Sequence, residues 1–184
     1  MVEQPVVFGL AVGALLIQVS LAAALLYFAA SRAGYNLEAV ERLKSRVAGR
    51  WRELSLGLAT LATGGSLYMS QVLGWTPCKL CWYIRIAIYP LVALFGTALF
   101  LNRQDVREYA IPLLLIGIPI SAYHYAIQRI DQFTSAGCSV FAVSCSTEYT
   151  FHFGYINISM LALTVQLAIL VLAWRFGSRR SRVP

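Results

Sequence analysis

Charged side chains are scarce in this sequence. Only 12% of its 184 residues are Asp, Glu, Lys or Arg, whereas 59% are hydrophobic and the mean hydropathy is +0.67. Soluble globular domains carry about 25% charged residues, so the composition excludes that class of protein. The sequence therefore predicts that a lipid bilayer surrounds most of the chain.

Long polar stretches are missing as well. Five apolar runs, at residues 6–30, 54–75, 81–101, 110–128 and 154–174, are joined by short connections. A helix needs about 20 mostly apolar residues to cross a bilayer. None of the runs alternates apolar and polar residues, which excludes β-barrel strands. We expect an all-α integral membrane protein with five spans, in which Gly57, Gly64 and Gly65 let helices approach closely.

The first apolar run has no Lys or Arg in front of it, and Glu3 is the only charge there. A secretory signal has a basic start and a shorter apolar stretch. We therefore expect residues 1–31 to form a retained transmembrane helix.

Basic residues gather in alternate connections. Twelve of the fifteen Lys and Arg residues follow the first, third and fifth runs. Cytoplasmic connections carry this excess, so we expect the N-terminus outside and the C-terminus in the cytoplasm. The second and fourth connections then face outward, and they contain all four cysteines.

The net charge of +7 does not predict nucleic-acid binding, because the charges lie at the ends of the spans, where topology and anionic lipids account for them. Residues 32–53 space apolar and basic residues at near-helical intervals, with Leu37, Val40, Val47 and Trp51 among the apolar ones. We expect a cytoplasmic amphipathic linker on the inner leaflet, and a basic cytoplasmic tail at residues 177–184.

The four cysteines form two pairs, Cys78 with Cys81 and Cys138 with Cys145. Thiols outside the cytoplasm tend to pair as disulfides, although four cysteines allow three pairings. A disulfide between Cys78 and Cys81 closes too short a ring to stabilise a fold, but it suits redox exchange. The second pair is either a structural disulfide that holds its aromatic loop together or a reactive pair that exchanges with a protein on the aqueous side.

Thr76 and Pro77 suit the N-cap and first position of the third helix, which places Cys78 in its first turn. The positive helix end is then expected to lower a thiol pKa. Spacings of three and four residues place Cys78, Cys81 and Arg85 on one face. Arg85 either reaches lipid headgroups or stabilises negative charge on a bound acceptor.

Phosphate-binding glycine loops are absent, and Trp82 follows Cys81 where a c-type haem motif needs His. Electrons that leave the dithiol therefore need another acceptor. A membrane quinone has suitable solubility and two-electron chemistry.

The chain resembles the DsbB family of membrane thiol oxidases, and most of all its BdbC-type branch. The resemblance rests on "GSLYMSQVLGWTPCKLCWYIRIAIYP", on "ISAYHYAIQ", and on the following cysteine pair with its aromatic segment and final span. It implies a four-helix transmembrane bundle core at residues 54–176, with the N-terminal helix outside that core. It also implies a multi-pass protein of a bacterial-type cytoplasmic (inner) membrane.

The resemblance further implies an enzyme that reoxidises a thioredoxin-like extracytoplasmic thiol oxidase and passes electrons to ubiquinone or menaquinone, with no metal. The partner's thiolate would attack Cys138, whose disulfide mate would be Cys145. Cys78 would exchange with that pair, Cys81 would be the thiolate beside the quinone, and Arg85 would polarise the quinone. Ile84 departs from the family, which often has a polar residue there.

His124 is a candidate for quinone contact through the same resemblance. Tyr68, Gln71 and Gln128 are further candidates for lining that cavity.

Two alternatives belong to another class of protein, and a third stays within redox chemistry. Four cysteines can bind a structural zinc ion, although this leaves Arg85 unexplained. The disulfides could instead be inert parts of a non-catalytic membrane protein. Vitamin K epoxide reductase-like proteins also join CxxC to a quinone, but there the CxxC follows the loop cysteines.

Overall fold

A computed structural model of the chain describes residues 5–33, 37–129, 145 and 150–177. Its regular elements are helical: α1 (Pro5–Arg32), α2 (Glu38–Gly49), α3 (Trp51–Leu67), the π-helical turn η1 (Tyr68–Val72), α4 (Lys79–Phe100), α5 (Val106–Arg129) and α6 (Ile158–Phe176). The described residues contain no strand, only an isolated bridge between His152 and Ile156. The all-α prediction is confirmed.

Four helices, α1, α4, α5 and α6, are long and apolar enough to cross a membrane. The α3 helix continues directly into η1, and together they reach the length of about 20 residues that a span requires. The predicted five spans therefore all correspond to helices. The second ends at Val72 rather than residue 75, and the fifth begins at Ile158 rather than residue 154.

The late start of α6 has a local cause. Phe153 and Gly154 both have positive φ, which makes a turn there instead of a helix. Asn157 then caps the helix, because its side-chain oxygen accepts a 2.9 Å hydrogen bond from the amide of Met160.

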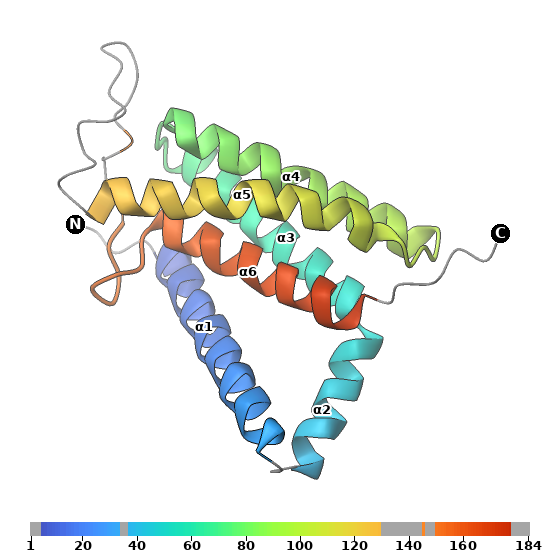
Figure 1. Cartoon of the computed structure of the whole chain (residues 1–184). Helices are drawn as coiled ribbons and strands as arrows, with labels where there is room; N and C mark the ends of the chain where they lie inside the picture. Colours follow the sequence, from blue (N-terminus) through green and yellow to red (C-terminus); the bar gives the residue numbers. More distant parts are fainter. Residues whose placement is uncertain (1–4, 34–36, 130–144, 146–149, 178–184) are drawn as a thin grey trace.

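Helices α3, α4, α5 and α6 form the predicted four-helix bundle, as Figure 1 shows. Each packs against two neighbours in a closed cycle, and α1 packs beside α6 on the outside of the bundle. The core includes Leu91, Leu114 and Ile169, from three different helices. Trp51 belongs to this core too, since its ring meets Phe95 edge-on at 6.0 Å. The bundle thus begins before residue 54, and Trp51 is not part of the linker's apolar face.

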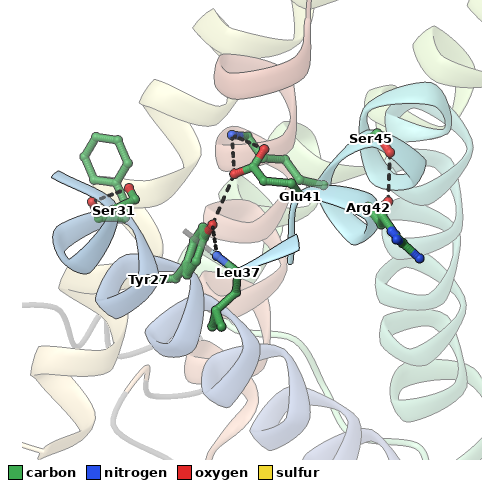
Figure 2. A network of polar contacts seen from close by, with 8 residues as sticks. Tyr27, Ser31, Leu37, Glu41, Arg42 and Ser45 are labelled. Atoms are coloured by element: carbon green, nitrogen blue, oxygen red, sulfur yellow. Dashed lines mark hydrogen bonds and ion pairs between the residues drawn. The ribbon is translucent and has the colours of Figure 1, made fainter. Parts of the chain in front are cut away.

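The predicted helix of the linker is present as α2, which has no buried residue. Figure 2 shows how its start meets the end of α1. The Tyr27 hydroxyl donates to Glu41 Oε1 at 3.2 Å and accepts from the amide of Leu37, while Lys44 pairs with Glu41. The position of α2 on the inner leaflet stays a prediction.

The buried residues through which α1 packs against the bundle lie in the N-terminal half of this helix. Its buried residues are Val7, Ala11 and Ala14, and a Cβ added at Gly65 would come within 2.9 Å of Leu10. Of the three glycines expected to permit close packing, only Gly65 does so, because a Cβ at Gly57 or Gly64 would meet nothing within 4 Å.

Candidate functional site

The CxxC motif lies where α4 begins. Cys78, and not Thr76, is the N-cap: its backbone is extended and its sulfur accepts a 3.4 Å hydrogen bond from the amide of Cys81. Helix α4 therefore starts at Lys79, two residues later than the predicted start at Pro77. The cap holds the two sulfurs 3.0 Å apart as free thiols.

The two thiols of this motif have different surroundings. Cys78 belongs to a buried cluster with Ile127 and Cys145, and its sulfur is 3.6 Å from Nε2 of His124. The same Nε2 lies 3.2 Å from the carbonyl oxygen of Cys145. Helix α5 thus places His124 between the CxxC motif and the loop that carries Cys145.

The pKa of Cys78 does not follow the expectation from its helix end. Its hydrogen bond with Cys81 and its burial raise the pKa of the Cys78 thiol to about 11, from an ordinary value of 9.0. These two effects outweigh the lowering of the pKa by the positive helix end. The Cys78 sulfur accepts only a weak hydrogen bond from the Cys81 amide, whereas it shares a proton with the Cys81 thiol. Burial also raises the pKa of the Cys145 thiol.

A mostly apolar cavity of about 320 Å³ lies beside Cys81. Cys81, Arg85 and His124 all line it, whereas Cys78 does not. The residues of the predicted common face therefore differ: Cys81 and Arg85 line the cavity, Cys78 is buried with Cys145, and Cys81 also packs against that buried cluster. The dithiol connects these two environments.

Arg85 is held at the cavity by Ser66 of α3. Its Nε donates to Ser66 Oγ at 3.0 Å, and its Nη2 donates to the Ser66 carbonyl at 3.1 Å. Its guanidinium carbon lies 5.2 Å from the centre of the Trp82 ring. No carboxylate among the described residues is close enough to pair with Arg85. This geometry favours a cation that can act on an acceptor over one that reaches headgroups.

Other predicted site residues lie elsewhere. Tyr68 and Gln71 are in η1, where Gln71 is exposed, and neither lines the cavity. Gln128 is one contact away from the cavity. The Oε1 atom of Gln128 accepts hydrogen bonds from Asn157 and from Ser159, and Ser159 lines the cavity. Cys138 lies outside the described residues. Quinone contact by Tyr68, Gln71 and Gln128 stays a prediction.

Two contributions to the cavity were not expected from the sequence. Ser66 orients Arg85, and Ser66 Oγ also accepts a 3.1 Å hydrogen bond from the Tyr89 hydroxyl. Helix α1 supplies a wall that includes Gly9 and Gly13. The spacing of Gly9 and Gly13, four residues apart, shows that both lie on one face of a helix, but it does not reveal that this face lines a cavity.

His124 carries a buried polar atom that needs a partner. Its ring is 2% exposed, and its Nδ1 has no hydrogen-bond partner among the described residues. The cavity lining combines apolar side chains with the cation of Arg85 and the imidazole of His124, a lining typical of sites that bind small, mostly apolar molecules with a few polar atoms.

The ligand atoms of Cys78, Cys81 and His124 lie within 4.8 Å of one another, a spacing that could also hold a metal ion. The Cys145 sulfur is not part of this group. The described residues therefore do not assemble the four-cysteine zinc site considered from the sequence.

The helices and the paired thiols define a multi-pass membrane protein with a dithiol at one end of its bundle. Sequence comparison identifies the family within this class of protein. Residues 50–176 match the family described as disulfide bond formation protein DsbB. The chain belongs to the DsbB family, and it is a disulfide-forming oxidoreductase of the membrane.

Similar proteins come from Bacillus and its relatives. The "Probable disulfide formation protein C 1" of Bacillus cereus is 43% identical over 115 residues, which cover 62% of this chain and 83% of the relative. The "Disulfide bond formation protein C" of Bacillus subtilis is 40% identical over 114 residues, with the same coverage. The predicted resemblance to the BdbC-type branch is confirmed. No solved structure matches the chain.

Proposed function

We propose that this protein is a thiol:quinone oxidoreductase that reoxidises a thioredoxin-like thiol oxidase outside the cytoplasm. One observation carries the proposal: Cys78 faces the loop cysteine Cys145, while its neighbour Cys81 lines an apolar cavity together with Arg85. Such a dithiol can receive electrons from the water side and deliver them to an acceptor dissolved in the bilayer.

Electrons enter at the loop pair. The partner's two thiols become a disulfide as the Cys138/Cys145 disulfide opens, with Cys138 as the sulfur that the partner attacks. The two loop thiols then reduce the Cys78/Cys81 disulfide and re-form their own. The shared buried cluster of Cys145 and Cys78 supports this exchange, because thiolate attack requires sulfurs that approach directly.

Electrons leave through Cys81. A quinone, when bound, supplies an acceptor of two electrons and two protons. Cys78 and Cys81 give up the electrons as they return to a disulfide. Arg85 stabilises negative charge in the cavity, because no described carboxylate neutralises it and apolar walls keep the local dielectric low. His124 Nδ1 offers a site that can bind a polar oxygen or pass a proton.

The test is a single turnover that needs only the purified chain. The protein is reduced with dithiothreitol, freed of it, and mixed anaerobically with decyl-ubiquinone or menadione while quinol and thiols are measured together. We expect one quinol per two thiols lost from wild type and none from Cys81→Ser. Wild-type protein that leaves the quinone unreduced, or Cys81→Ser with normal turnover, would contradict the proposal.

The entry step has its own variant. Cys138→Ser is expected to keep the single turnover with quinone but to lose oxidation of a reduced thioredoxin-like oxidase. A variant that still oxidises this protein at the normal rate would remove Cys138 from its assigned role.

Arg85→Ala is expected to raise the apparent KM for quinone by about tenfold to a hundredfold, which corresponds to about 1.4 to 2.7 kcal/mol. Arg42→Ala serves as control, because Arg42 is an exposed arginine on α2. An unchanged KM for quinone in Arg85→Ala would mean that Arg85 contacts lipid headgroups and does not act on the quinone.

The group formed by Cys78, Cys81 and His124 favours one second candidate, a bound metal ion. Metal analysis of the purified protein distinguishes the two functions. Stoichiometric zinc together with unreactive thiols would replace the oxidase by a structural metal site.

A further inference from the structure

Helix α1 lies outside residues 50–176, the part of the chain that matches the family, yet it forms one wall of the cavity. The lining residues that it supplies are Gly9, Leu10, Gly13, Ala14 and Ile17. The other walls come from the bundle helices α3 to α6 and from the segment before α4. An element added to the family's core therefore completes the candidate acceptor site.

Specific contacts hold α1 in this place. Gln18 donates to Thr164 Oγ1 at 2.8 Å and accepts a 2.6 Å hydrogen bond from the Tyr155 hydroxyl, which ties α1 to α6 and to the turn before it. On the other side, Leu10 packs at Gly65 of α3. Helix α1 thus bridges α3 and α6 across the cavity.

The two glycines of this wall are not packed against a neighbour. A Cβ at Gly9 or at Gly13 would meet nothing within 4 Å, whereas a Cβ at Gly65 would collide with Leu10. Since Gly9 and Gly13 line the cavity, their missing side chains widen it. A larger residue at either position can enter the cavity without displacing the backbone.

The cavity lining combines polar groups with many apolar ones, and none of the polar groups comes from α1. Its reactive and polar groups come from the bundle, with Cys81 and Arg85 on α4 and His124 on α5, whereas the α1 wall is entirely apolar. A membrane quinone has the same division, between a ring with two carbonyl oxygens and an isoprenoid tail.

We infer that α1 is the wall against which the quinone's tail binds, with Gly9 and Gly13 providing the width for it. The ring lies at the opposite end, beside Cys81 and Arg85. This inference rests on the proposed function. It gives the added helix a part in acceptor affinity and in discrimination between acceptors with and without a tail.

Binding to oxidised protein tests the inference without turnover, because the oxidised chain has no electrons to donate. Trp75 lines the cavity, so tryptophan fluorescence reports occupancy. The variant is Gly13→Leu, and the matched control is Ala23→Leu, an exposed position of α1 that does not line the cavity. The two probes are decyl-ubiquinone, which has a tail, and menadione, which has none.

Gly13→Leu is expected to weaken decyl-ubiquinone binding at least about tenfold, to change menadione binding less than about threefold, and to leave the melting temperature at or above that of wild type. Ala23→Leu should match wild type with both probes. Equal weakening of both probes would show that α1 meets the ring and would overturn the tail assignment.

The two proposals fail in different ways. If wild type binds decyl-ubiquinone and Gly13→Leu binds it equally well, the role of α1 is wrong and the proposed acceptor stands. If wild type binds neither probe, both proposals are overturned. Should Gly13→Leu not fold, Gly9→Leu makes the same test from one turn away on the same wall.

Discussion

At the scale of single residues, the site depends on how one short motif distributes its groups. Cys78 ends the loop and caps α4, whereas Cys81 and Arg85 belong to the helix and face the cavity. The raised pKa of Cys78 means that this sulfur keeps its proton at neutral pH and can donate it to Cys81 across 3.0 Å. This agrees with the proposal that Cys81, which lines the cavity, is the sulfur that acts on the acceptor.

This proton sharing leads to a prediction about pH. In reduced protein, alkylation of Cys78 should rise with pH to a midpoint near 11, because only the thiolate reacts. In Cys81→Ala the largest cause of the shift is gone, so the midpoint should fall toward 9.0. Alkylation over a pH series, measured on the Cys78 peptide by mass spectrometry, gives both values.

The control for this experiment is Arg42→Ala, since Arg42 is an exposed arginine of α2 and is not among the causes that shift Cys78. Its midpoint should stay near that of wild type. A midpoint that is the same in Cys81→Ala and wild type would mean that burial, and not the shared proton, sets the pKa of Cys78.

Much of the site could be predicted from its residues, and the rest depends on contacts between distant segments. Helical spacing correctly placed Cys81 and Arg85 together, because both lie within one helix. The same spacing placed Cys78 beside Cys81, and their sulfurs are 3.0 Å apart, but it does not reveal that the Cys78 sulfur itself acts as the cap of α4. Ser66 could not be found as the partner of Arg85, because 19 residues and a loop separate them.

At the scale of helices, neighbouring helices of the bundle approach one another closely at a few small residues. Gly117 of α5 is the tightest described case inside the bundle, where a Cβ would lie 2.7 Å from the Ala87 Cβ and 2.5 Å from Nε2 of Gln166. Gln166 is itself fixed there, because its Oε1 accepts a 2.8 Å hydrogen bond from Ser121. Glycine at this position lets α5 meet α4 and α6 at once.

Gly117→Ala is therefore expected to destabilise the bundle. Overpacking costs about 1–3 kcal/mol, which the better helix propensity of alanine offsets by at most about 1 kcal/mol. Gly96→Ala is the matched control, because a Cβ there meets nothing within 4 Å and only the propensity gain remains. Thermal unfolding in detergent should show a lower melting temperature for Gly117→Ala and an equal or higher one for Gly96→Ala. Equal melting of both variants would contradict the tight packing at Gly117.

The helices show what a sequence pattern can and cannot predict. Apolar runs located the helices, four of which are individually long and apolar enough to cross a membrane, because the length that crosses a bilayer is a property of each segment alone. Which glycine meets a neighbour is a property of pairs, so Gly65 could not be distinguished from Gly57 or Gly64. The position of α1 depends on hydrogen bonds from Gln18 to Tyr155 and Thr164, each of which is more than 130 residues away from Gln18 in the sequence.

At the scale of the whole molecule, the described cysteines lie at one end of the bundle, and the basic residues Arg52 and Arg103 lie at the other. The start of α4, the end of α5 and the start of α1 share one end in Figure 1, and the connection between α4 and α5 lies at the other. At that second end, Arg52 donates to the carbonyl of Arg103 at 2.7 Å. This separation agrees with the charge asymmetry from which the orientation was predicted, and the orientation itself stays a prediction.

Labelling of single cysteines in a cysteine-free background tests the orientation. The three reporters are Glu3→Cys, Lys79→Cys and Ser45→Cys, and the last two are exposed positions of α4 and α2. Glu3→Cys and Lys79→Cys should react with an impermeant maleimide in intact cells, because five spans place both outside. Ser45→Cys on α2 should react only after permeabilisation, since basic connections stay in the cytoplasm. Labelling of Ser45→Cys alone in intact cells would invert the topology, and labelling of Lys79→Cys without Glu3→Cys would mean that α1 does not cross the membrane.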